Sequence, residues 1–376
     1  MYVQRCAGTL VTMTAPDAIP GWDGLARDRS FYLSAGWLRF ADSDNVARSR
    51  YLGLTVDGRL VAALSSHRAA EEIDPGYVAA RTLELTPPAP AEGVLTLGGR
   101  RGFLSGALVA PGADRAAAAG HLAELIGHAA DGPWWWPYLA GADADLLATG
   151  PARPGVHLVG ADCVIDVTGT TLEDHVAALP TQQRRTNFRR EAQRFAGSRL
   201  EIRPITLAGH WPRLGALLAA VQRKYGHPQS AAEMGQRLRR QGERLASRAV
   251  VFGCFDGADL IGFALAYEWG GELALRVVGF DYERLPGADE YAQLAVHAPL
   301  RYCYAHGLRR LHLGVGSYAA KCRRGARARP LWAVTSLPAM DRDGLDRAVR
   351  RLTAAMPAHE SASFGACAGQ AWERWR

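Results

Sequence analysis

A basic, glycine-containing segment is the part of the sequence best suited to bind an anion. Gly314 and Gly316 allow a ligand to approach the backbone closely. Arg holds a phosphate or carboxylate through two parallel hydrogen bonds, whereas Lys acts as a point charge. The segment predicts either a donor-binding site, in which we include Tyr318, or a solvated basic loop. Its cations are Lys321, Arg323, Arg324, Arg327 and Arg329.

A second group of cations lies upstream, in the helical segment TQQRRTNFRREAQRFAG. Spacings of four and five place most of its arginines on a common helix face. That face fits the phosphates of a tRNA as well as it fits a solvated surface, and no interleaved aromatic residues mark base stacking. We include Arg185 and Arg189 among the predicted binding residues. The full set is Arg184, Arg185, Arg189, Arg190 and Arg194.

Three residues are candidates for proton transfer or substrate orientation, and each also has a structural explanation. Tyr291 is suited to donate a hydrogen bond or a proton to a leaving group, or it packs. Glu290 precedes it in the first turn of a predicted helix, where a negative charge is favourable for structural reasons alone. Glu268, in YEWGG, is either a base or a hairpin residue.

Other chemistry finds no support in the sequence. The six cysteines form no Cys-x-x-Cys pair and do not lie at zinc-ligand spacing from a histidine. No Ser-His-Asp or Cys-His pattern is present, and Gly-Val-Gly-Ser at 314–317 is not a nucleophile elbow. We therefore predict no metal site.

The elements that must position these residues occur twice. Asp-Gly pairs at 57–58 and 256–257 each interrupt two β-rich runs, and such pairs are strong hairpin signals. Pro-Gly-Ala-Asp occurs at 111–114 and 286–289, each time before a helical pattern and then a short strand, WWWPYLAG or RRLHLGVG. We interpret this as tandem duplication of one α/β module. Each module has a mostly antiparallel sheet, a turn, a helix and a strand that returns parallel.

The element order of the module resembles the GNAT acyltransferase fold, and tandem modules resemble the FemAB-like or peptidoglycan-biosynthesis-type acyltransferases. The segments VQRKYGHPQSAAEMGQRL and EYAQLAVHAPLRYCYAHGLRRLHLGVGSYAAKCRRG carry the resemblance, over roughly residues 160–335. It implies that two central strands splay apart around an acyl donor. It also implies that the helix after the turn points its N-terminus at the donor's pyrophosphate.

The sequence departs from that group at two places. Ala319-Ala320 stands where the family usually carries Glu-His before the lysine. The turn Arg284–Ala288 lacks the glycine pattern of acetyl-CoA-binding GNAT proteins, and Pro286 removes one backbone donor. Acetyl-CoA in the usual pose is therefore less favoured than the fold alone suggests.

The resemblance also gives Asp281 two roles. It ends a strand beside the expected splay, where GNAT sites gather, so it either orients an amine and accepts its proton or caps the turn. With Tyr291 and Lys321 it forms the predicted catalytic set. Lys321 and Arg324 are expected to hold the donor's phosphates or the developing charge.

Length and composition bear on the number of domains, the kind of partner and the compartment of the protein. The chain has 376 residues, which suits two domains, and a net charge of +7, which fits either an ordinary basic surface or an anionic partner. We find no signal peptide or apolar run of membrane-spanning length, and the cysteine usage fits a reducing compartment, so we expect a cytoplasmic protein.

We therefore predict an α/β protein with two tandem GNAT-like modules. Residues 1–160 form a degenerate first module, and residues 161–376 carry the site. The predicted activity is acyl or aminoacyl transfer from acyl-CoA or aminoacyl-tRNA to an amine of a small molecule or peptide, with no tightly bound cofactor. Two alternatives stay open: other chemistry on an anionic biosynthetic intermediate, and a non-catalytic protein that works with a partner subunit.

Overall fold

A computed structural model describes residues 8–44, 47–69, 72, 74–83, 85, 93–149, 154–227 and 229–375. The chain divides into two compact units. The first contains residues 1–161, 329–354 and 358–376, and the second contains residues 162–328 and 355–357. Residues 329–354 and 358–376, which the sequence places in the second module, thus belong to the first unit.

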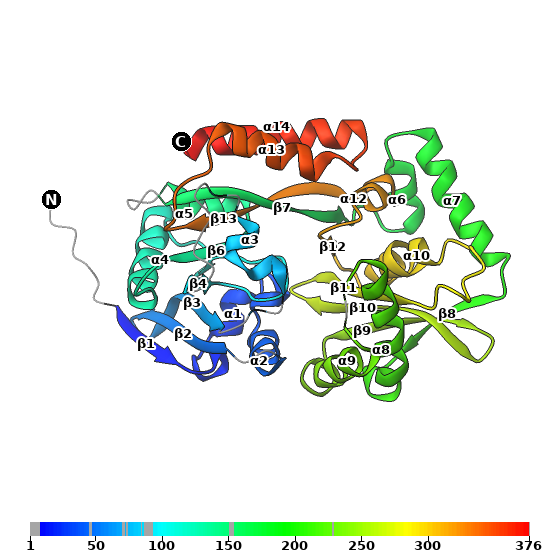
Figure 1. Cartoon of the computed structure of the whole chain (residues 1–376), viewed down its shortest axis with the longest axis horizontal. Helices are drawn as coiled ribbons and strands as arrows, with labels where there is room; N and C mark the ends of the chain where they lie inside the picture. Colours follow the sequence, from blue (N-terminus) through cyan, green and yellow to red (C-terminus); the bar gives the residue numbers. More distant parts are fainter. Residues whose placement is uncertain are drawn as a thin grey trace. The chain divides into compact units, whose positions relative to one another are not determined.

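The first unit is built on a mixed sheet with the strand order β1-β2-β3-β4-β6-β13-β7, and β5 pairs with β3. Its strands are β1 (Thr9–Met13), β2 (Ala47–Val56), β3 (Arg59–Ala69), β4 (Leu95–Leu97), β5 (Leu108–Val109), β6 (Trp134–Ala140) and parts of β7 (Gly155–Asp166) and β13 (Arg327–Thr335). Its helices are η1 (Pro16–Ala18), α1 (Trp22–Ala26), η2 (Phe31–Leu33), α2 (Ala35–Asp44), η3 (Pro75–Tyr77), α3 (Ala79–Thr82), α4 (Arg115–Ala129), α5 (Gly141–Ala148), α13 (Arg342–Thr353) and α14 (Ala358–Trp375) (Figure 1).

The second unit has the strand order β7-β12-β11-β10-β9-β8. Its further strands are β8 (Leu200–Ile205), β9 (Ala249–Asp256), β10 (Asp259–Trp269), β11 (Glu272–Phe280) and β12 (Arg310–Gly314). Its helices are α6 (Leu172–Ala178), α7 (Gln182–Ala196), α8 (Leu207–Lys224), α9 (Ala231–Leu245), α10 (Glu290–Ala292), the π-helical turn η4 (Gln293–His297), α11 (Ala298–Ala305) and α12 (Tyr318–Arg323).

Both units contain the module that the sequence predicts. The Asp-Gly pairs form the tight turns β2–β3 and β9–β10, with Gly58 at φ 74° and Gly257 at φ 61°. The turns that begin with Pro-Gly lead into α4 and α10, and β6 and β12 then return parallel to β4 and β11. The predicted break at Pro180 separates α6 from α7.

Helices cover both faces of the sheet in the second unit. Gly262 of β10 faces Leu294 of η4, whereas Gly279 of β11 faces Leu217 of α8. Gly279 pairs with the residue after Gly262, so their faces are opposite. The helix that follows the turn and the helix α8 therefore enclose the strands from two sides.

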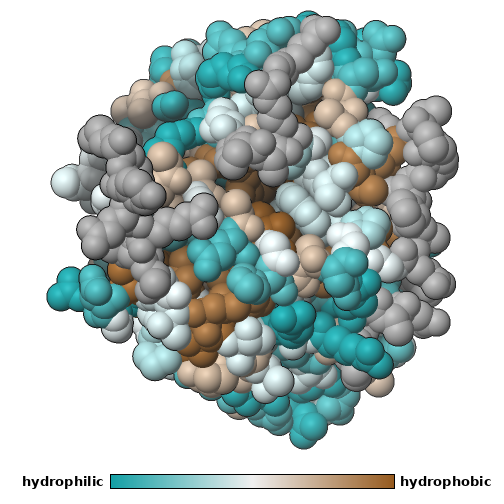
Figure 2. Space-filling model, turned by 90° about the vertical axis from the view of Figure 1, so that its left-hand side faces the viewer, coloured by the Kyte–Doolittle hydropathy of each residue, from teal (hydrophilic) through white to brown (hydrophobic). Residues whose placement is uncertain are grey.

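Apolar side chains are mostly withdrawn from the surface. Figure 2 shows one face of the protein, on which hydrophobic residues gather near the middle and hydrophilic residues surround them. Among the described residues, the large hydrophobic side chains that are exposed are Met13, Tyr225 and Tyr282. No helix in the described part of the chain is long and apolar enough to cross a membrane.

Candidate functional site

The strands β11 and β12 separate after a short parallel contact. Their pairing covers Glu272 to Ala274 on β11, opposite Arg310 to His312 on β12, whereas β11 continues to Phe280. This is the splay that the GNAT resemblance predicts. It places the turn after β11 and the glycine-containing exit from β12 at the same end of the unit.

The backbone N–H groups of the turn after β11 are bound by a side chain of the same turn, Glu290. The Glu290 carboxylate accepts hydrogen bonds from the backbone N–H groups of Gly287 (3.0 Å) and Ala288 (2.9 Å), and its residue is only 5% exposed. Free N–H groups at such a turn are suited to a phosphate. Here Glu290 already occupies those of Gly287 and Ala288, so a phosphate ligand needs other donors.

Helix α7 supplies a second wall. Thr181 caps its N-terminus by accepting a hydrogen bond from the Arg184 backbone, and Phe188 and Glu191 are its buried residues. Residues three, four and seven apart share a helix face. Arg184, Arg190 and Arg194 lie on the Glu191 side of the helix and line the same pocket as Glu191. Arg185 and Arg189 lie on the other side of Phe188 and do not line it.

A pocket of about 700 Å³ lies within the second unit, between α7, the start of α10, α12 and residues 355–357. This volume suits a small-molecule or cofactor-sized ligand. Five guanidinium groups line it, together with one carboxylate, so the pocket strongly favours anions. The charged lining residues are Arg184, Arg190, Arg194, Arg323, Arg324 and Glu191.

Glu191 fixes one of these arginines. Arg324 donates two hydrogen bonds to its carboxylate, from Nε (2.9 Å) and Nη2 (2.7 Å), and His297 Nε2 lies 3.0 Å from the same group. Phe188 stacks on the His297 ring at 3.9 Å. Burial raises the pKa of Glu191, but its bonds to His297 and Arg324 outweigh burial and lower it. Glu191 therefore stays ionised and orients Arg324.

The other arginines of the pocket are held more loosely. Arg194 Nε forms an ion pair with Asp289 at 2.6 Å. Arg190 and Arg323 are exposed and make no hydrogen bond or ion pair with any described residue. These two guanidinium groups are therefore available to an anionic ligand.

Tyr291 stands at the pocket wall with its hydroxyl close to Ser317. Burial raises its pKa, although the hydrogen bond with Ser317 and the charge of Arg324 lower it in part. The phenol therefore stays protonated at neutral pH and is able to donate a hydrogen bond. Asp289 and Ser317, which precede α10 and α12, both have a left-handed backbone (φ 62° and 48°), a strained conformation for non-glycine residues.

The predicted site residues are all within the described ranges, and Tyr291, Arg323 and Arg324 are the ones that line the pocket. Lys321 does not: it is 5% exposed, and its ammonium donates to the carbonyls of Gly314 (3.1 Å) and Val315 (2.9 Å). Its contacts close the turn formed by Gly314 (φ 68°) and Gly316 (φ 73°). Tyr318 is the first residue of α12, directly after that turn.

The remaining predicted residues have partners outside the pocket. Asp281 forms an ion pair with Arg213 at 2.8 Å, and Glu268 accepts a hydrogen bond from the Tyr302 hydroxyl at 2.9 Å. Arg185 donates to the Leu179 carbonyl at 2.6 Å, and Arg189 pairs with Glu173. The pocket does not bring these four residues together.

Sequence reasoning missed Glu191, His297 and Asn187 of this region. Glu191 is a lone acidic residue among arginines, and its sequence context suggests an ion pair within its own helix. Its partner in the structure is Arg324, 133 residues away. His297 lies in an apolar stretch with no sequence signal for its partner. Asn187 lines the pocket from α7.

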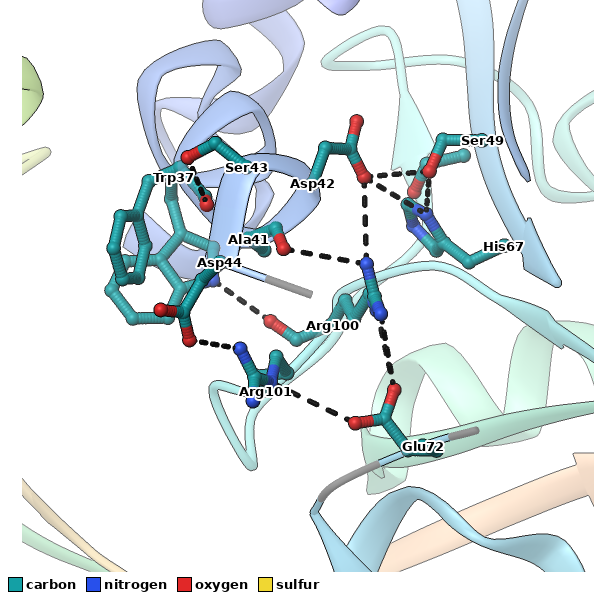
Figure 3. A network of polar contacts seen from close by, with 12 residues as sticks. Trp37, Ala41, Asp42, Ser43, Asp44, Ser49, His67, Glu72, Arg100 and Arg101 are labelled. Carbon is teal, nitrogen blue, oxygen red and sulfur yellow. Dashed lines mark hydrogen bonds and ion pairs between the residues drawn. The ribbon is translucent and has the colours of Figure 1, made fainter. Parts of the chain in front are cut away.

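A separate polar network lies in the first unit (Figure 3). Arg100, 1% exposed, is within 3.3 Å of Glu72 and 3.6 Å of Asp42, and Arg101 pairs with Asp44. Ser49 lies 2.6 Å from Asp42 and 2.9 Å from His67 Nδ1. Burial lowers the pKa of His67 to about 4. The Ser49 hydroxyl thus lies between His67 and Asp42, an order that differs from that of a Ser-His-Asp triad.

No group of three or more His, Cys, Asp or Glu side chains in the described part of the chain is arranged to hold a metal ion.

Known structures share this fold. FemX matches with a TM-score of 0.59 at 8% identity, over 87% of this chain and 97% of that one. A conserved protein of unknown function from Bacteroides thetaiotaomicron VPI-5482 matches with a TM-score of 0.56 at 13% identity, over 85% and 95%. The C-terminal domain (DUF2156) of a putative lysylphosphatidylglycerol synthetase from Agrobacterium fabrum matches at 0.50 and 10%, over 89% and 93%.

These identities establish likeness of fold. The predicted resemblance to FemAB-like proteins and the predicted fold class of tandem GNAT-like modules are confirmed at that level. No protein-family model matches the sequence, and no curated protein matches it.

Proposed function

We propose that this protein transfers an acyl or aminoacyl group from an activated donor to an amine of a small molecule or peptide, forming an amide. The observation that carries the proposal is the pocket between α7, α10 and α12, which five arginines and one carboxylate line. The fold shared with FemX agrees with it as a fold-level analogy, and the argument rests on the site. We place the site in the second unit and assign none to the first.

The pocket accounts for how an anionic donor is held. Acyl-CoA and aminoacyl-tRNA both carry phosphates, and Arg190 and Arg323 are exposed to receive them. Glu290 already occupies the turn's backbone donors. The phosphates are therefore bound by arginine side chains, whichever donor is used.

The chemical step joins the amine nitrogen to the donor carbonyl carbon. The tetrahedral oxyanion that forms receives a hydrogen bond from the protonated Tyr291 hydroxyl, with Arg324 nearby. The C–S or C–O bond to the donor then breaks, and the leaving sulfur or oxygen takes up the proton that the amine loses. That proton travels through solvent, because Glu191 is held ionised by its partners and Asp281 is paired with Arg213. Lys321 is a positioning residue that holds the turn at 314–316.

The test uses the full chain with two labelled donors, charged tRNA and acyl-CoA, and hydroxylamine as a surrogate amine. We expect one donor to raise the melting temperature and to be discharged by the protein. The Tyr291→Phe variant should retain donor binding and lose about ten-fold or more in turnover, because it lacks the hydrogen bond to the oxyanion. Stabilisation and discharge by neither donor would refute acyl transfer, and would favour the alternatives of other chemistry or a partner-dependent subunit.

A further inference from the structure

Two tyrosines of the second unit are exposed large side chains. Tyr225, at the end of α8, is 63% exposed, and Tyr282, just after β11, is 38% exposed. They lie 57 positions apart (282 − 225), so the sequence gives no sign that they are neighbours. Both belong to the second unit.

Ring contacts connect these tyrosines to the pocket. The buried Phe280 ring lies 6.0 Å from the Tyr282 ring and 6.3 Å from the ring of Tyr291, which lines the pocket. Lys224, which directly precedes Tyr225 at the end of α8, lies over the Tyr282 ring, so the end of α8 and the turn after β11 are side by side. The aromatic surface is therefore continuous with the wall formed by Tyr291.

The aromatic surface carries positive charge of its own. The Lys224 ammonium lies over the Tyr282 ring, 4.2 Å from its centroid. An amine substrate in its ammonium form is repelled by this lysine and by the arginines beyond it. An uncharged acyl chain gains nothing from the cations. A ligand that combines a flat ring with phosphates gains from both parts of the surface.

We propose that Tyr225 and Tyr282 form a stacking subsite for the base of a nucleotide whose phosphates bind the arginines of the pocket. The inference rests on the proposed function, because it describes how that donor is held. The nucleotide is the chemistry common to coenzyme A and to the unpaired end of a tRNA. Base–aromatic stacking tolerates any base, since every base has a flat face.

The stacking subsite also changes how the basic helix is interpreted. The sequence of α7 has no interleaved aromatics, which speaks against a nucleotide ligand. The aromatic rings instead come from the end of α8, the turn after β11 and the start of α10. Cations and rings meet only in the folded chain.

The test measures equilibrium binding of four probes by calorimetry: AMP, coenzyme A, uncharged tRNA and inorganic pyrophosphate. The protein carries either Tyr225→Ala with Tyr282→Ala, or the matched control Tyr225→Phe with Tyr282→Phe, which keeps both rings. We expect the alanine pair to weaken AMP, and coenzyme A or tRNA, by about ten-fold or more, and the phenylalanine pair to stay within about two-fold of wild type. Pyrophosphate, which has no base, should bind all three proteins alike.

The outcomes distinguish a failure of the stacking subsite from a failure of the proposed transfer reaction. Ring-dependent binding of coenzyme A identifies one source of the nucleotide, and ring-dependent binding of tRNA identifies the other. Equal nucleotide affinity in all three proteins overturns the stacking subsite, even if transfer occurs. If the alanine pair loses as much affinity for pyrophosphate as for the nucleotides, the subsite is also overturned. The rings would then support the structure of the phosphate site and would not contact a base. Ring-dependent nucleotide binding without transfer refutes the proposed function alone.

Discussion

Lys321 and Arg323 show how two neighbouring cations take opposite roles. Both belong to the same short helix and the same basic segment of sequence. Lys321 is buried and donates to two backbone carbonyls, whereas Arg323 is exposed in the pocket without a partner among the described residues. Two positions along α12, which point to opposite sides of the helix, therefore separate a structural cation from one that is free to bind a ligand.

Substitution of each residue should separate stability from binding. We expect Lys321→Met to lower the free energy of unfolding by about 1–3 kcal/mol, because the carbonyls of Gly314 and Val315 lose their donor. Arg323→Ala should change stability by less than about 0.5 kcal/mol and weaken donor binding. Urea denaturation and calorimetry measure the two effects. Equal loss of stability in both variants would contradict this division.

A histidine that is 13% exposed gives the second unit a dependence on pH. His312 lies between two carboxylates, with Nδ1 3.0 Å from Asp162 and Nε2 2.7 Å from Glu272. Burial lowers its pKa, but the two carboxylates outweigh burial and raise it from 6.5 to about 9. Because the folded pKa is the higher one, this stabilisation is complete below about pH 6.5 and is lost as the pH rises through 9.

We expect the wild type to lose about 3 kcal/mol of unfolding free energy between pH 6.5 and 10 relative to His312→Gln, since one pKa unit corresponds to about 1.4 kcal/mol. The difference between the two proteins is the informative quantity, because groups other than His312 contribute equally to both curves. Urea denaturation across the pH series measures it. Parallel curves for both proteins would show that His312 is neutral in the folded state.

At the scale of the element, helix α7 presents arginines on two faces with different surroundings. Arg190 faces the pocket, whereas Arg189 pairs with Glu173 elsewhere on the surface. We expect Arg190→Gln to weaken donor binding by about ten-fold, because a charge-assisted contact to phosphate is lost. Arg189→Gln removes the same charge from the same helix and should leave affinity nearly unchanged. Calorimetry of both variants at one salt concentration measures the two affinities. An equal loss of affinity in both would show that the arginines act through the overall positive charge of the helix and that Arg190 makes no specific contact.

The turn before α10 depends on its internal carboxylate. We expect Glu290→Ala to destabilise the protein by about 1–3 kcal/mol, because the N–H groups of Gly287 and Ala288 lose a buried acceptor. Glu290→Gln keeps an oxygen acceptor and should cost less. Thermal and urea unfolding of both variants measure the difference. An alanine variant as stable as the glutamine variant would show that water replaces the carboxylate at no cost.

Some of the site was predictable from the sequence, and the reason is local. Arg323, Arg324 and Tyr291 follow signals within a few residues of themselves: a glycine-rich exit, a Pro-Gly turn and a helix start. The partner of Arg324 and the exposed pair Tyr225 and Tyr282 depend on contacts between segments far apart in the chain. No periodicity or turn signal encodes such contacts, so a single sequence does not reveal them.

For the molecule as a whole, the stability of the first unit rests partly on the buried ion network around Arg100. We expect Arg100→Met to cost about 3–5 kcal/mol, because Glu72 and Asp42 lose their buried partner. Arg39→Met, which breaks an exposed pair with Asp17, should cost about 0–1 kcal/mol. Urea denaturation compares them, and donor affinity under native conditions should stay unchanged in both. Similar costs would show that the network contributes little.

The duplicated module was predictable because its turns are marked by Asp-Gly and Pro-Gly at matching places. The membership of residues 329–354 and 358–376 in the first unit was not. It depends on β13 pairing with β6, about 190 residues earlier, as at Leu331 and Ala140 (331 − 140 = 191). Strand pairing over such a distance leaves no mark in local composition.

The pairing of β13 with β6 has a consequence for synthesis on the ribosome. The first unit begins to emerge first, but its strand β13 and the helices α13 and α14 emerge last. Until then β6 is paired on one side only, with β4, and its open edge invites association with other chains. Nearly all of the second unit, residues 162–328, is available earlier. The module that starts the chain is therefore completed last, and a fragment ending near residue 160 would remain in this unfinished state.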